Sequence, residues 1–249
     1  MKKRLAIVAA GVLVVGCYFA ARPVRLGDEE RRSLAGGYKF TSAPIEECAD
    51  HPAHKTVRRV HPSLQRISAW ISSVGASATL ADLDQDGLAN EIISVDPRTD
   101  LVTVSCAPTK GTRFKPFALE RESWGRGYDV NALAPTGTLV GDFNEDGLAD
   151  ILVYFWGRTP LLYLRQAAQT GDLTAASFRA EELSATGERW YSDCALQADL
   201  DGDGRLDLIF GNYFQDGARA LDEKASGTET LHQGKAKALN GGFKHVFLR

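Results

Sequence analysis

The sequence lacks the short motifs that mark the common catalytic classes. It contains no G-x-S-x-G, no H-E-x-x-H, no phosphate-binding P-loop and no C-x-x-C. It also lacks an excess of positive charge, since 29 Lys and Arg residues stand against 32 Asp and Glu residues and the formal net charge is −3. A basic surface of the kind that binds nucleic acid is therefore not indicated.

Cysteine is also scarce, with four residues in the whole chain: Cys17, Cys48, Cys106 and Cys194. We expect Cys17 to be used at the membrane, which leaves an odd number, so at most one disulfide forms within the chain. A bridge between Cys48 and Cys106 is preferred because Cys194 precedes a strand in the middle of a repeated unit. The alternative is three buried, unpaired thiols.

A long apolar run lies at the N-terminus, where residues 5–21 follow three basic residues. This pattern predicts a signal peptide or N-terminal anchor over residues 1–21 and a charged tether over residues 22–37. The sequence VVGC, ending at Cys17, resembles the bacterial lipobox, in which the cysteine is acylated. A lipoprotein acylated on Cys17, an uncleaved anchor and an ordinary cleaved signal remain as alternatives. Each places the rest of the chain outside the cytoplasm, in the periplasm or at the cell surface.

The folded region is expected over residues 38–249, and its composition, 44% apolar and 24% charged for the whole chain, permits one sizeable core. Four residues with metal-binding side chains lie near its start: Cys48, Asp50, His51 and His54. Pro52 breaks any helix that would align them, and no second half-site accompanies them. We therefore expect a loop without metal there.

Carboxylates at alternate positions, followed by a glycine, occur three times in the chain. The segments are DLDQDGLAN at 82–90, DFNEDGLAD at 142–150 and DLDGDGRLD at 199–207. Their first aspartates are 60 and 57 residues apart, which is room for one supersecondary unit with insertions. Such closely spaced oxygens suit Ca²⁺, which takes about 6–8 oxygen ligands. The sequence therefore predicts up to three calcium loops, in which ten of the 32 acidic residues are proposed ligands.

These loops differ from an EF-hand, which needs a glutamate at its twelfth position. The twelfth positions here are Ile93, Val153 and Phe210, and the ninth position supplies the last side-chain ligand instead. Solvated hairpin turns are the alternative interpretation, because Asp, Asn and Gly are common turn residues. Turn chemistry does not explain an oxygen at a fixed offset after the glycine in all three copies. A cation held within one short loop leaves little room for a substrate, so a structural role is expected.

Apolar segments flank each loop. Those before the loops are ATLADL, GTLVGDF and ALQADL, and those after are EIISV, ILVYF and LIFGN. They are short and most are rich in β-branched and aromatic residues, so each loop is expected at the tip of a β-hairpin. Further strands are expected at ISAWISSV, LVTVSCA, PFALE, PLLYLRQ, SFRAEEL and KHVFLR. Three units of about four short strands predict an all-β fold, a β-propeller of four-stranded blades.

The loops and their flanks resemble FG-GAP/VCBS repeats, the β-propeller repeats of integrin α-subunit heads and many secreted bacterial proteins. The segment WYSDCALQADLDGDGRLDLIFGNYF further resembles the repeats of ASPIC/UnbV-type propeller proteins. The resemblance implies calcium hairpins that brace the blades. The side-chain ligands that it implies are Asp82, Asp84, Asp86, Asn90, Asp142, Asn144, Asp146, Asp150, Asp199, Asp201, Asp203 and Asp207. Backbone carbonyls would come from Leu88, Leu148 and Arg205. Because Asn90 stands where the family usually has Asp, the first site is expected to be one of the weaker ones.

Propellers of this family commonly have about seven blades, which need more chain than is present, so a partial propeller of about three to four blades is expected. It is the front part of a longer protein, a truncated paralogue, or a ring closed by something supplied in trans. An open sheet edge also predicts self-association or strand addition from a partner, with ISAWISSV and KHVFLR as the contact surfaces.

The expected function is that of an exported, calcium-stabilised, non-catalytic propeller that binds a protein or a glycan at the cell surface, attached to the membrane through its N-terminus. An enzyme acting on polysaccharide is the competing class, because a site assembled from distant blades would escape a motif search. Its candidate residues at a propeller mouth are Glu120, Glu122, Trp124, Asp129 and Trp156. A vestigial fragment without independent function is the third alternative.

Overall fold

The structure, a computed structural model, describes residues 2–22, 26–46, 48, 57–108, 113–120, 124, 132–167, 172–229 and 244–247. The chain divides into two compact units, Met1–Ala43 and Pro44–Arg249. The second unit therefore begins a few residues after the start that was predicted at Tyr38.

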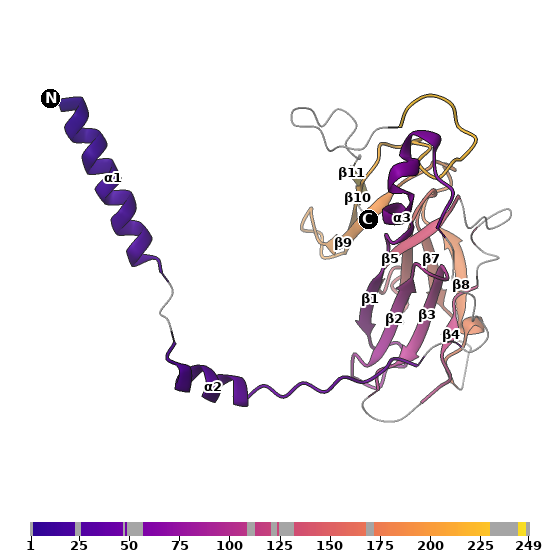
Figure 1. Cartoon of the computed structure of the whole chain (residues 1–249). Coiled ribbons are helices and arrows are strands. Elements are labelled where there is room, and N and C mark those ends of the chain that lie inside the picture. The colour runs from indigo at the N-terminus through magenta and orange to yellow at the C-terminus, as the bar shows by residue number, and fades with distance from the viewer. Residues whose placement is uncertain are drawn as a thin grey trace. The chain divides into compact units, whose positions relative to one another are not determined.

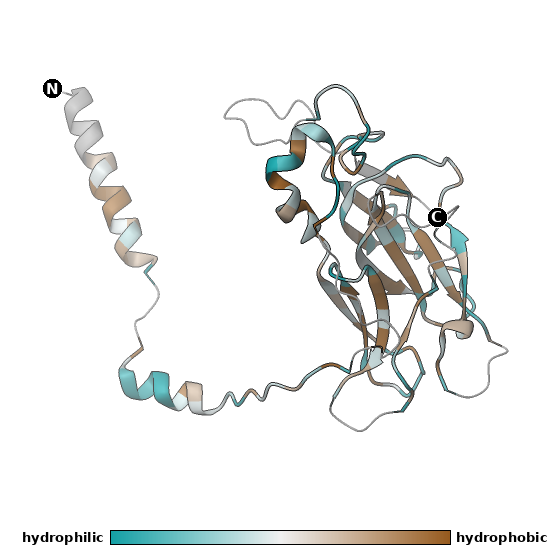
Figure 2. Ribbon diagram, turned by 45° about the vertical axis from the view of Figure 1, so that its right-hand side comes forward, coloured by the Kyte–Doolittle hydropathy of each residue, from teal (hydrophilic) through white to brown (hydrophobic). Residues whose placement is uncertain are grey.

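The first unit contains two helices, α1 (Lys2–Ala20) and α2 (Asp28–Gly36). The predicted tether is thus helical over much of its length. Acidic residues occupy the first turn of α2, and the carboxylate of Glu30 accepts the N–H of Gly27 at 2.9 Å, which suits the positive end of the helix dipole. Figure 2 shows that α2 is mainly hydrophilic. A search of the described residues finds no helix with the length and hydropathy of a membrane span.

The second unit contains three antiparallel sheets, each of which meanders in chain order (Figure 1). The first is made of β1 (Ser77–Ala81), β2 (Glu91–Asp96), β3 (Leu101–Cys106) and β4 (Phe117–Ala118). The second is made of β5 (Ala134–Gly141), β6 (Asp150–Trp156), β7 (Leu161–Arg165) and β8 (Phe178–Glu182). The third is made of β9 (Ser192–Ala198), β10 (Asp207–Asn212) and β11 (Lys244–Phe247). This confirms the predicted all-β, propeller-like fold with two four-stranded units and a third with three strands in the described residues.

The first strands of the three sheets lie next to one another, as the inner strands of neighbouring propeller blades do. The hydroxyl oxygens of Thr79 on β1 and Thr138 on β5 are 2.8 Å apart. On the other side, the side-chain amide of Gln197 on β9 donates to the carbonyl of Val140 on β5 at 3.0 Å. Polar contacts thus join each inner strand to the next.

Strand β6 shows why the strand segments are apolar without alternation. Its side chains alternate between the two faces of the second sheet, and both faces are covered. Val153 belongs to the buried cluster shared with the first sheet, whereas Leu152 and Tyr154 belong to the cluster shared with Phe210 of the third. Figure 2 shows the resulting concentration of hydrophobic residues on the strands. The core of this unit therefore lies between successive sheets.

The prediction that ISAWISSV is a strand was wrong. The segment starts at the last residue of a 3₁₀ helix, η1 (Pro62–Ile67), and most of it forms a short α-helix, α3 (Ser68–Ser72). Pro62 occupies the first turn, where it costs no hydrogen bond, and the ring nitrogen Nδ1 of His61 accepts the N–H of Ser63 at 3.1 Å. The apolar residues Leu64, Ile67, Ile71 and Val74 follow helical spacing and pack into one cluster.

This helical segment closes the unit against residues that follow β10. The N–H of His61 donates to the carbonyl of Ala220 at 2.9 Å, and the hydroxyl of Tyr191 donates to the carbonyl of Ala218 at 3.0 Å. Trp156 and Phe214 lie in the same buried cluster. One side of ISAWISSV, with Ile67, Ile71 and Val74, therefore packs inside the unit, whereas Trp70 is exposed.

One face of the third sheet carries exposed apolar side chains. Ile209 is paired across the sheet with both Leu196 and Val246, so the three share a face. Leu196 is 62% exposed and Val246 is 53% exposed. Phe210, on the opposite face, is fully buried against the second sheet. Strand β10 thus has a sequence suited to burial on both faces but is covered on one by the described residues.

All four cysteines are free thiols, so the preferred bridge between Cys48 and Cys106 is not formed. The thiol of Cys48 lies 3.8 Å from the carbonyl oxygen of Pro116, and that of Cys106 lies 3.8 Å from the carbonyl oxygen of Phe114. Cys194 is exposed. Cys48 belongs to the segment that was expected to be a loop without metal, and the other three residues named there, Asp50, His51 and His54, lie outside the described residues.

Candidate metal centres

The three acidic segments form three hairpin loops of almost identical backbone shape. Each joins the first two strands of a sheet, as predicted. In each, the first aspartate accepts two N–H groups from the middle of the loop. The bonds run to Asp82 from Asp86 (3.0 Å) and Gly87 (2.9 Å), to Asp142 from Asp146 (3.0 Å) and Gly147 (2.8 Å), and to Asp199 from Gly202 (2.7 Å) and Gly204 (3.0 Å). The aspartate therefore fixes the fold of its own loop.

Two positions in every loop have positive φ. The fourth positions are Gln85 (62°), Glu145 (60°) and Gly202 (82°), and the sixth positions are Gly87 (86°), Gly147 (85°) and Gly204 (89°). Glycine adopts such angles without the steric cost that a Cβ imposes. The repeated glycine of the motif is thus explained by backbone conformation.

A buried carboxylate closes each loop at the start of the second strand. Asp150 accepts the N–H of Phe143 at 2.9 Å, and Asp207 accepts the N–H of Leu200 at 2.7 Å. In the first loop the same bond, from the N–H of Leu83 at 2.6 Å, goes to Glu91. The family resemblance had implied Asn90 as the closing residue of this loop.

The strand register explains the difference. Glu91 is paired with Ala81, the residue before the first aspartate, just as Asp150 is paired with Gly141 and Asp207 with Ala198. The first loop is therefore one residue longer, so the assumed equivalence of Asn90 with Asp150 and Asp207 was wrong. A signal was present in the sequence, because a carboxylate follows Asn90 directly.

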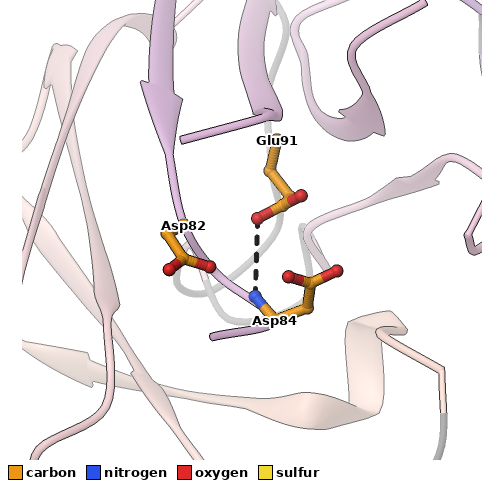
Figure 3. Close-up of side chains that lie close together, drawn as sticks. All are labelled: Asp82, Asp84 and Glu91. Carbon is orange, nitrogen blue, oxygen red and sulfur yellow. Dashed lines mark hydrogen bonds between the residues drawn. The ribbon is translucent and has the colours of Figure 1, made fainter. Parts of the chain in front are cut away.

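The carboxylates converge in two of the loops. In the first, Asp82, Asp84 and Glu91 each offer an oxygen, and these atoms lie within 4.8 Å of one another (Figure 3). In the third, Asp199, Asp201 and Asp207 do the same. Three oxygens so arranged can face a single cation of the size of Ca²⁺.

The second loop carries Asn144 at the third position, and its side-chain amide donates to Asp146 at 2.9 Å. Burial raises the pKa of the Asp150 carboxyl, while hydrogen bonds from the N–H groups of Arg165 and Phe143 lower it and the charges of Asp146 and Asp142 raise it again. The net direction is upward. A cation in this loop would relieve the cost of that buried charge.

Neighbouring loops touch each other through their fourth residues. The side-chain amide of Gln85 donates to the carbonyl of Gly147 at 2.9 Å, and Arg205 Nε lies 3.6 Å from the carboxylate of Glu145. All three loops therefore lie side by side along one edge of the sheets.

The proposed carbonyl ligands occupy equivalent places in the three loops. The N–H groups of Leu88, Leu148 and Arg205 donate to Asp86, Asp146 and Asp203 at 2.8, 2.9 and 2.9 Å. The carbonyl of Leu88 already accepts the N–H of Asn90 at 2.8 Å, a consequence of the extra residue in the first loop.

The predicted lipidation residue, Cys17, is exposed on α1.

The residues proposed for a catalytic site at a propeller mouth do not form one in the described part of the chain. Trp124 and Trp156 are buried in two different clusters. The indole N–H of Trp124 donates to the hydroxyl of Tyr163 at 2.5 Å, and that hydroxyl donates to the backbone carbonyl of Glu120 at 3.1 Å. Glu122 and Asp129 lie outside the described residues.

Comparison with known families gives one match. Residues 142–210 match the FG-GAP-like repeat, a segment that runs from the start of the second loop through β6, β7, β8, β9 and the third loop into β10. Searches of curated proteins and of solved structures found no match. The repeat thus extends from one acidic loop to the next.

Proposed function

We propose that this chain, which carries an FG-GAP-like repeat over residues 142–210, is an exported, calcium-stabilised, non-catalytic binding module with a partial propeller fold. FG-GAP repeats suggest a propeller-type binding module. The match does not separate ASPIC/UnbV-type proteins from other proteins with this repeat. The observation that carries the calcium proposal is the third loop, where three aspartates converge and each accepts a hydrogen bond from a backbone N–H group.

Calcium is the cation that this ligand chemistry favours. The loops offer carboxylate, amide and backbone carbonyl oxygens, and the described loop residues include no sulfur or imidazole donor, which zinc would prefer. We propose that the second loop binds Ca²⁺ through Asp142, Asn144, Asp146, the carbonyl of Leu148 and Asp150. The third would use Asp199, Asp201, Asp203, the carbonyl of Arg205 and Asp207. A cation at each hairpin tip would hold two strands of a sheet together, which is a structural role.

Urea unfolding of the full chain with Ca²⁺ and with a chelator tests this proposal. A ligand that binds the native state alone stabilises it by mass action, so added Ca²⁺ should raise the unfolding midpoint and the chelator should lower it. Mg²⁺ at the same concentration is the control, because it is smaller and demands a stricter octahedral geometry. A midpoint that is the same in Ca²⁺, Mg²⁺ and chelator removes calcium from the function.

The uncovered face of the third sheet supports a binding role. Leu196 and Val246 present apolar surface there, and among the described residues β11 is the last strand of the sheet, so its backbone groups could pair with another strand. We propose that a protein covers the exposed face or edge of this sheet, either a partner that adds a strand to it or a second copy of this chain. Sedimentation of the full chain, with Leu196→Asp as the matched variant, measures this. A chain that is monomeric in both forms would exclude a second copy of this chain and leave a different protein or a glycan as the ligand.

We further propose that the N-terminal segment places the module outside the cytoplasm and that Cys17 anchors it as a lipid-bearing residue. Palmitate labelling and globomycin-sensitive processing, both lost in Cys17→Ser, are the expected results. An unprocessed, unlabelled chain that stays with the membrane fraction in both forms would support the uncleaved anchor instead.

A further inference from the structure

Arg113, from the segment between β3 and β4, lies among the acidic side chains of the first loop. Its Nε donates to Asp84 at 2.8 Å, and its Nη2 donates to the carboxylate of Glu91 and to the side-chain oxygen of Asn90. One guanidinium thus contacts three of the oxygen-bearing side chains of the loop. Two of these, Asp84 and Glu91, are members of the converging group in Figure 3.

Burial explains why a positive charge is needed at this place. Glu91 is fully buried, and a buried carboxylate without a compensating charge or hydrogen bonds is costly. One of its oxygens accepts the N–H of Leu83, and the other accepts from Arg113, whose side chain is 25% exposed. The planar guanidinium presents several N–H donors in a fixed fork, which suits two carboxylates at once.

A second arginine, Arg165 on β7, interacts with the charge of Asp84 and with the second loop. Burial lowers the pKa of the Arg165 guanidinium, and the negative charge of Asp84 opposes this lowering. The backbone N–H of Arg165 donates to Asp150 of the second loop at 2.8 Å.

We propose that the guanidinium of Arg113 is the resident cation of the first loop, and that this loop excludes Ca²⁺ while the second and third loops bind it. This rests on the proposed calcium function. A calcium ion would need oxygens of Asp84 and Glu91 at about 2.3–2.6 Å, and these are the side chains that face Arg113. The two positive charges would also repel each other across a partly buried space. Three similar motifs therefore give two metal sites.

The test is the number of Ca²⁺ ions bound by the full chain, measured by equilibrium dialysis, in the wild type, in Arg113→Gln and in Arg113→Lys. The glutamine variant removes the charge from the site, so it should bind one ion more than the wild type. The lysine variant keeps a positive charge near the carboxylates and should bind the same number as the wild type. Circular dichroism of each variant establishes that it is folded.

A second experiment leaves Arg113 in place. Glu91→Gln removes a carboxylate from the first loop, and Asp207→Asn removes the equivalent carboxylate from the third. The first substitution should leave the number of bound ions unchanged, and the second should reduce it by one. This comparison remains valid if Arg113→Gln fails to fold.

The outcomes separate the inference from the function on which it rests. An unchanged count in folded Arg113→Gln, or the loss of one ion in Glu91→Gln, would overturn the assignment of Arg113. A wild-type chain that binds no Ca²⁺ would overturn the calcium function, while an ion gained by Arg113→Gln would still support the exclusion of calcium by the arginine.

Discussion

In the first loop a guanidinium from another part of the sheet contacts Asp84 and Glu91, whereas the third loop brings Asp199, Asp201 and Asp207 together from its own residues. The two loops nevertheless bend in the same way. In both, the first aspartate accepts the N–H of the glycine at the sixth position, at 2.9 Å and 3.0 Å. The shape of the loop is therefore set by local hydrogen bonds, and its charge is balanced separately.

The residues that shape the first loop and the residue that balances its charge lie in different parts of the sequence. The residues that shape the loop lie within it and repeat, so they are visible in the sequence. Arg113, whose positive charge balances the carboxylates of the first loop, is 22 positions away from Glu91. The sequence of the loop gives no indication of this contact. A motif of this kind can predict a backbone without predicting a bound cation.

Of the substitutions that compare the two loops, removal of Arg113 is expected to lower the free energy of unfolding most. With a chelator present, Arg113→Ala should lower the free energy of unfolding by about 3 kcal/mol, because it leaves the buried carboxylate of Glu91 without its guanidinium. Urea unfolding measures this. Arg179→Ala is the matched control, since Arg179 forms an ion pair with Glu181 in which both side chains are exposed, and such pairs contribute about 1 kcal/mol or less. Equal losses in the two variants would mean that the first loop does not depend on its arginine.

Loss of a proposed calcium ligand from the third loop should have the second-largest effect on the free energy of unfolding. At a Ca²⁺ concentration about 100 times the dissociation constant, one site stabilises the native state by about 2.7 kcal/mol. Asp201→Ala should therefore lose about that much in Ca²⁺, because it deletes a carboxylate of the most acidic motif. Asn90→Ala should lose much less, since Asn90 contacts Asp86 and Arg113 in a loop whose charge the arginine already balances.

The unfolding of both variants in chelator is the control for this prediction. There the difference between them should shrink, because no site is filled in either. A difference of the same size with and without Ca²⁺ would assign the effect of Asp201 to the loop backbone, where it accepts the N–H of Asp203 at 3.2 Å.

The sheets were predictable from the sequence because their signals are local. Every residue of a run such as ILVYF faces a covered surface, so the whole run is apolar. The acidic turns then mark the ends of the hairpins. ISAWISSV was misread because it is short and rich in β-branched and aromatic residues, although its large apolar residues have the spacing of a helix. Glu91 was missed because Asn90 stands at the offset of the closing residue in the other two loops, and the register of β1 with β2 shows that the first loop is one residue longer. Arg113 was missed because its contact depends on the path of the chain between β3 and β4.

The fourth position of the loops offers the smallest and most specific test of the shared backbone. Gly202 has a φ of 82°, while Gln85 and Glu145 adopt 62° and 60° at the same place. A Cβ added to Gly202 would meet no atom within 4 Å, so Gly202→Ala should cost only the backbone term of about 1 kcal/mol for a left-handed residue. Gln85→Ala is the matched control: its Cβ is already accommodated, and it loses one exposed hydrogen bond to Gly147, so its effect should be a few tenths of a kcal/mol. Urea unfolding in chelator compares the two without any contribution from metal. A larger loss in Gln85→Ala than in Gly202→Ala would show that contacts between the loops, and not a common backbone, hold the first loop in its shape.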